Sequence, residues 1–137
     1  MSLENYRRDA KLWLGQAEDD VTAARTLAAA GNHAQACFLA QQAGEKALKA
    51  IWYFFGLEPW GHSLFNLIGE FPVESVRPSL DELTDAASAL DKLYIPTRYP
   101  NGLPNMMPRD AYRANDSEAA LAAATQVIQT AKELCNF

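Results

Sequence analysis

The chain has 137 residues, of which 49% are hydrophobic and 21% charged, so the expected organisation is one ordered domain spanning residues 1–137. A net charge of −5 argues against broad binding to nucleic acid, which needs many Lys and Arg contacts with phosphate, but leaves room for a local basic site. No signal-peptide pattern or membrane-spanning run is present, and the two cysteines are far apart. We therefore expect a cytoplasmic protein with free thiols and no membrane contact.

The first half of the chain has the apolar spacing of two long helices. Apolar residues three and four positions apart predict an amphipathic helix over residues 3–27 that ends near Gly31. Asn32 is a candidate N-cap for a second helix over residues 33–55, which stops at the glycine that follows. Two long helices joined by so short a turn are expected to pack antiparallel.

The second half of the chain predicts shorter elements around a proline-rich connection. Ser63 is a candidate cap for a short helix over residues 64–71, and a longer helix is predicted over 79–94. Residues 94–116 contain four prolines, and an alanine-rich last helix is predicted over 117–134. Because no alternating β-branched run occurs, the expected fold class is all-α. The expected architecture is an antiparallel up-and-down four-helix bundle with one extra short helix.

The second predicted helix has two contrasting faces. One face consists of small residues suited to close helix packing, with a phenylalanine at its end: Ala36, Ala40, Ala43, Ala47, Ala50 and Phe54. The opposite arc is polar and has aromatic residues near its ends: Phe38, Gln41, Gln42, Glu45, Lys46, Lys49 and Trp52. Such an arc is either a solvated face with pairs such as Glu45–Lys49, or a dimer face, or the wall of a ligand site.

The proline-rich connection gathers arginine and tyrosine on an otherwise acidic chain. It contains Arg98 beside Tyr99, followed by Arg109 and Arg113. Arginine offers a planar fork for phosphate, and tyrosine offers a stacking surface for a base. The residue types allow two other interpretations, namely that Arg98 binds carbonyl groups at the end of the preceding helix or that the segment contacts a partner protein.

Several phrases occur together in an order that resembles the HEPN domain family. After Trp13 come AEDDVTAARTLAAAGNHAQACFLAQQAGEKALKAIW, then GHSL, YIPTRYP and DAYRANDSEAALAAA, which together cover nearly the whole chain. The resemblance implies a helical bundle that is commonly homodimeric and has links to nucleotide binding and RNA processing. It also implies a minimal nucleotidyltransferase as a possible partner, in a toxin–antitoxin or related pair.

The same resemblance bears on catalysis. Catalytic members of the family cleave RNA without a metal, using an arginine followed four to six residues later by a histidine. Arg98 matches that arginine, but Gly102, Pro104 and Asn105 stand where the histidine is expected. Arginine neutralises phosphate but does not shuttle a proton near neutral pH, as histidine does. We therefore expect no ribonuclease activity, unless the fold brings His62 to the proline-rich segment; otherwise His62 braces the turn before the short helix.

These patterns together predict a binding or accessory module for a nucleotide, RNA or a nucleotidyltransferase partner. The chain lacks the HExxH, GxxxxGK[ST], GxGxxG and GxSxG motifs, so we expect no metal and no cofactor. The alternative is a metal-independent endoribonuclease that uses Arg98 and His62. The expected ligand-binding residues are Arg98, Tyr99, Arg109 and Arg113, backed by Gln41, Glu45 and Lys46.

Overall fold

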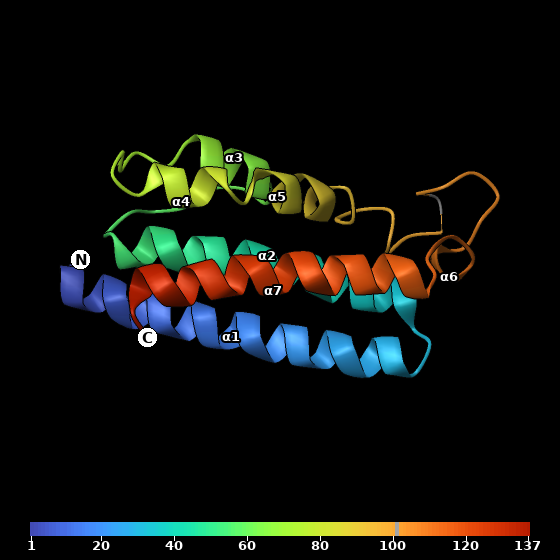
Figure 1. The fold of residues 1–137 in the computed structure, drawn as a ribbon. Helices are drawn as coiled ribbons and strands as arrows, with labels where there is room; N and C mark the ends of the chain where they lie inside the picture. The colour runs from blue at the N-terminus through green and yellow to red at the C-terminus, as the bar shows by residue number, and fades with distance from the viewer. Residues whose placement is uncertain (101) are drawn as a thin grey trace.

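The computed structural model describes residues 1–100 and 102–137, which contain helices and connections but no strand (Figure 1). Three long helices lie side by side, and they are α1 (Leu3–Ala29), α2 (His33–Phe54) and α7 (Ala114–Cys135). α1 runs antiparallel to α2 and α7, so both chain termini lie at one end of the bundle. The predicted all-α helical fold class is therefore confirmed.

The fourth position of the bundle is filled by a series of short helices. α4 (Arg77–Asp81) and α5 (Thr84–Asp91) follow one another along the far side of α2, and α3 (Leu64–Gly69) lies beside them (Figure 1). The prediction of a single helix over 79–94 is therefore wrong, although its residues do occupy the fourth position. No helix among the described residues is long and apolar enough to cross a membrane.

A local hydrogen bond explains why the fourth helix is interrupted. The Thr84 hydroxyl donates to the Asp81 carbonyl at 2.8 Å, and the Leu83 N–H donates to the Leu80 carbonyl at 2.9 Å. Both contacts span three residues, which tightens the chain and takes carbonyl groups out of the α-helical pattern. Leu80 and Leu83 nevertheless remain buried in the core. The apolar residues that were assigned to one helix are therefore buried by two shorter helices and the turn between them.

The helix ends agree in part with the predicted caps. Gly31 has φ of 85° in the turn after α1, so the first helix ends near this glycine as predicted. Ser63 caps α3, since its hydroxyl accepts the Asn66 N–H at 3.1 Å. Asn32 precedes α2, but its side chain accepts no hydrogen bond from the first turn, so the predicted capping role is wrong. α2 therefore begins with an uncapped turn.

The end of the proline-rich connection contains structure that the sequence pattern did not predict. A short helix, α6 (Pro108–Ala111), precedes α7, and α7 begins three residues earlier than expected. The Asp116 carboxylate accepts the Arg113 N–H at 2.9 Å and so closes the first turn of α7. The buried Ser117, at the expected helix start, instead donates its hydroxyl to the Ala114 carbonyl.

The small face of α2 packs closely against its neighbours, as predicted. Gly44 lies beside this face, where an added Cβ atom would stand 2.6 Å from Leu90 Cδ1 and 2.9 Å from Leu64 Cδ2. The absence of a side chain at position 44 therefore lets Leu64 of α3 and Leu90 of α5 pack directly against α2 at this point. The alanines of the face are all fully buried: Ala36, Ala40, Ala43, Ala47 and Ala50.

Candidate functional site

Arg98 follows α5 in a run of turns, and its guanidinium lies among three aromatic rings. Its Cζ is 4.6 Å from the ring centroid of Tyr94, 4.8 Å from that of Phe38 and 5.0 Å from that of Tyr99. Its Nε donates to the Tyr94 carbonyl at 2.9 Å; Arg98 thus binds a carbonyl group, but one in the turns after α5 and not at the helix end. No carboxylate of the described residues forms an ion pair with Arg98. Aromatic faces attract the cation without neutralising it, so its charge remains available to an anion.

A hollow of about 370 Å³ lies beside Arg98 and brings it together with Arg109. The hollow opens at the first turn of α2, which has neither a side-chain cap nor an acidic residue. Backbone N–H groups at the start of a helix favour anions, as the two guanidinium groups do. The hollow is thus suited to a phosphate-bearing ligand. Its lining residues are Gly31, Asn32, Gln35, Thr97, Arg98, Pro100, Met107, Pro108 and Arg109.

The remaining arginine, tyrosine and lysine of the predicted ligand set lie elsewhere. Tyr99 packs against Arg98 with about half of its surface exposed, but it does not line the hollow. Arg113 is exposed at the start of α7, and Lys46 pairs with Asp20 of α1. The structure therefore assembles Arg98 with Arg109 but does not bring Arg113 or Lys46 to the same hollow.

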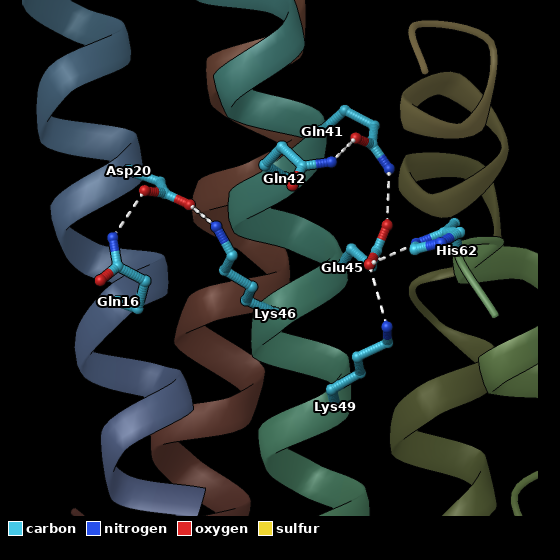
Figure 2. A network of polar contacts seen from close by, with 8 residues as sticks. All are labelled: Gln16, Asp20, Gln41, Gln42, Glu45, Lys46, Lys49 and His62. Carbon is cyan, nitrogen blue, oxygen red and sulfur yellow. Dashed lines mark hydrogen bonds and ion pairs between the residues drawn. The ribbon is translucent and has the colours of Figure 1, made fainter. Parts of the chain in front are cut away.

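The polar arc of α2 is largely covered, so its interpretation as a solvated face is wrong. Gln41, Glu45 and Lys49 are 0%, 5% and 9% exposed. The Glu45 carboxylate accepts from the Gln41 amide at 3.2 Å and from Lys49 Nζ at 3.0 Å, and His62 Nδ1 lies 3.1 Å from Glu45 Oε2 (Figure 2). Glu45 thus joins α2 to the turn that precedes α3.

The other edge of the arc is covered by α1. Lys46 forms an ion pair with Asp20, whose other carboxylate oxygen accepts the Gln16 amide at 2.9 Å (Figure 2). Gln42 donates to the side-chain carbonyl oxygen of Gln41 at 2.8 Å and so belongs to the network of Glu45. The polar arc is therefore divided between two networks on opposite sides of α2.

His62 reaches the start of the proline-rich segment. Its ring stacks on Tyr94 with 5.2 Å between centroids and 17° between planes, so His62 and Arg98 contact the same aromatic ring. His62 braces the turn through its contacts with Glu45 and Tyr94, while Ser63 caps α3 and donates to Asp91 at 2.9 Å. A small open hollow of about 170 Å³ lies here, lined by His62, Ser63, Asp91 and Tyr94. The fold therefore brings His62 to the proline-rich segment, which was the stated condition for His62 to replace the missing histidine of the catalytic motif.

The two cysteines are buried and line neither hollow. Burial raises the pKa of Cys37 to about 11 and that of Cys135 to about 12. A thiol with so high a pKa stays protonated at neutral pH and is a poor nucleophile or metal ligand. Across the described parts of the chain, no cluster of three or more His, Cys, Asp and Glu side chains could hold a metal.

Several residues of the two hollows and their aromatic surroundings were not included in the predicted ligand set. Asn32 and Gln35 line the larger hollow, while Phe38 and Tyr94 contact the Arg98 guanidinium. Phe38 did carry a signal, because an aromatic residue beside a polar arc is unusual on a solvated helix. The spacing of Phe38 and Gln35 by three residues also places both on the side of α2 that faces the proline-rich segment.

The chain is similar to several known helical proteins. TT1696 from Thermus thermophilus has 38% identity and a TM-score of 0.85, over 91% of this chain and 97% of that one. ST0689, an archaeal HEPN homologue, has 32% identity and a TM-score of 0.76, over 92% and 97%. "Putative toxin MJ1304" of Methanocaldococcus jannaschii is 28% identical over 90% of this chain and 86% of its own length. The HEPN domain family model matches residues 10–134, and the chain belongs to the HEPN domain family.

Proposed function

We propose that this chain is a HEPN-type binding module whose larger hollow takes the phosphate of a nucleotide or an RNA strand, without cleaving it. The observation that carries this proposal is the pairing of Arg98 and Arg109 around a hollow at the uncapped start of α2. Arg98 is half-buried, held by aromatic rings and without a carboxylate partner among the described residues. A bound phosphate would supply the missing negative charge, and an adjacent base would find the exposed Tyr99 ring.

We also propose that the module acts as a homodimer in a toxin–antitoxin-like pair with a minimal nucleotidyltransferase. Membership of the HEPN family and similarity to a protein named as a toxin support this proposal. Co-expression of the chain with a nucleotidyltransferase encoded beside it, followed by size-exclusion chromatography with light scattering, tests both parts. A monomer that elutes apart from that protein would contradict them.

Calorimetric titration with a short single-stranded RNA and with ATP tests the phosphate site. Replacing Arg98 with alanine removes a charge-assisted contact and is expected to weaken binding about tenfold to a hundredfold. Arg109→Ala is expected to have a smaller effect because Arg109 is exposed. Arg8→Ala is the matched control, since this exposed arginine lies near the opposite end of α1. No heat with either ligand, or equal weakening by Arg8→Ala, would contradict the proposal.

A metal-independent ribonuclease is the second candidate, favoured by the ring of Tyr94 that His62 and Arg98 share. In this reaction His62 Nε2 would take the proton of a ribose 2′-hydroxyl. The 2′-oxygen would bond to phosphorus as the P–O5′ bond breaks, and the leaving 5′-oxygen would take a proton from water. Arg98 would neutralise the charge that develops on the phosphate oxygens.

Incubation of the protein with tRNA and mRNA in the presence of a chelator separates the two candidates. The binding module leaves both RNAs intact. Cleavage that disappears in both Arg98→Ala and His62→Ala would establish the ribonuclease and overturn the binding-only function. Cleavage that survives both substitutions would come from a contaminating nuclease, and purification to constant specific activity would identify it.

A further inference from the structure

The outward side of α7 is a helix surface without charge. Residues 119–131 contain no Asp, Glu, Lys or Arg, and the flanking charges are Glu118 and Lys132. Surface helices normally have charged residues on their solvent side, and a loss of charge is typical of the centre of a protein interface. We call this surface the α7 face. Its exposed residues are Ala119, Ala122, Thr125, Gln126 and Gln129.

Much of the α7 face lines a wide, open hollow of about 750 Å³. Pockets for small molecules are clefts that bury most of the ligand, whereas an open surface of this kind suits a protein. The hollow is also lined by Arg25 of α1 and by Glu82, which follows α4. Because α7 lies between α1 and the series of α4 and α5, Arg25 and Glu82 stand on opposite sides of the α7 face (Figure 1).

Arg25 and Glu82 both lack an oppositely charged partner among the described residues. Arg25 donates to the Thr125 hydroxyl at 3.2 Å, but neither Arg25 nor Glu82 forms an ion pair there. Lys132, at the end of the uncharged stretch, differs because it pairs with Glu18 of α1. The α7 face thus has an unpaired cation on one side and an unpaired anion on the other.

We propose that the α7 face is the surface through which two copies of this chain form a dimer. This inference rests on the homodimer proposed above and names its surface. A two-fold axis along α7 exchanges the two sides of the face, so each Arg25 lies opposite the partner's Glu82. The uncharged centres then pack on each other, and two ion pairs at the edges fix the register.

The distribution of charge favours a second copy over a different protein. Both members of the ion pair come from one chain, and they lie at the same hollow on opposite sides of α7. A surface with this arrangement is complementary to itself, which is the condition for an interface with two-fold symmetry.

Reversal of the two charges tests this inference. R25E brings two carboxylates together at each edge of the dimer, and E82R brings two guanidinium groups together. Each substitution is expected to raise the dissociation constant of the dimer about tenfold or more. An equimolar mixture of R25E and E82R is expected to dimerise, because each reversed charge then meets an opposite charge. The double variant R25E/E82R is expected to recover for the same reason. Size-exclusion chromatography with light scattering over a dilution series measures these constants.

A second pair of variants tests the centre of the α7 face. A122E introduces a charge there and is expected to weaken the dimer about tenfold or more, since the carboxylate would lie in the interface. A23E is the matched control, because Ala23 is an exposed alanine of α1 two positions from Arg25 and so lies on the other side of that helix. It is expected to dimerise like the wild-type protein. Circular dichroism confirms that each variant is folded.

The possible outcomes separate this surface from the homodimer on which it rests. A wild-type protein that is monomeric throughout the dilution series would overturn both. A wild-type dimer that R25E, E82R and A122E leave unchanged would overturn the α7 face and leave the homodimer standing. If R25E and E82R are both monomeric and their mixture is monomeric too, the pairing of Arg25 with the partner's Glu82 is wrong.

Discussion

Two buried carboxylates, those of Asp20 and Glu45, belong to separate polar networks (Figure 2). The networks differ in whether all partners of the carboxylate lie within the packed helices. Asp20 pairs with Lys46 and accepts the Gln16 amide, so its partners all come from α1 and α2 and join these helices. Glu45 accepts from Gln41 and Lys49 of its own helix, but its third partner is the exposed ring of His62. A carboxylate satisfied within the bundle stabilises packing, whereas one that anchors an exposed imidazole also positions a group that a ligand can reach.

The largest expected effect is the loss of stability in Glu45→Ala. This substitution leaves the nearly buried Lys49 ammonium without its ion pair and the buried Gln41 amide without its acceptor. Removing one partner of a buried pair predicts a loss of about 3 kcal/mol in the free energy of unfolding. Urea denaturation followed by circular dichroism measures it. A loss below about 1 kcal/mol would mean that water reaches this network in solution.

A smaller loss is expected for Asp20→Ala, on the other side of α2. About a quarter of the Lys46 side chain is exposed, so water can solvate its ammonium after the partner is removed. We therefore expect a loss of about 1 to 2 kcal/mol in the free energy of unfolding. The affinity for single-stranded RNA is expected to stay at the wild-type value. A weakened affinity in the folded variant would show that the two networks are not separate.

The smallest effect on stability is expected for His62→Ala. Because most of the His62 side chain is exposed, its contacts with Glu45 and Tyr94 contribute about 0.5 kcal/mol or less to folding. The affinity for single-stranded RNA, in contrast, is expected to change, because His62 and Arg98 contact the same Tyr94 ring. Parallel denaturation and binding curves measure both quantities. A stability loss as large as that of Glu45→Ala would make His62 a structural residue and remove the contrast between the networks.

The sequence predicted the packing of α2 better than it predicted the partners of its polar residues. Helical periodicity placed the alanines on one face because burial of that face depends only on spacing along the helix. The same wheel grouped Glu45 with Lys46, yet the structure gives them partners from different elements. Asp20 and His62 lie 26 and 17 residues away from these partners in the chain, and spacing along one helix carries no information about such contacts.

The proline-rich segment shows the same division between local and tertiary information. Residue type and family resemblance pointed to Arg98, and the structure places it with Arg109 at one hollow. The role of Tyr94 was not predicted, since it depends on α5 ending where the turn containing His62 lies against α2. The interruption of the fourth helix escaped prediction because it lies with local hydrogen bonds of Leu83 and Thr84, at a position where the apolar spacing continues.

The measurement that tests the proposed site most directly is the imidazole NMR spectrum of His62 during titration with a short single-stranded RNA. If the phosphate lies on Arg98, whose guanidinium contacts the same Tyr94 ring as His62, the His62 nitrogen resonances shift to saturation at the RNA concentrations that calorimetry reports. In Arg98→Ala the same shift requires about tenfold or more RNA, because the phosphate contact is lost. His62 resonances that stay unchanged while RNA saturates the protein would contradict the proposed site.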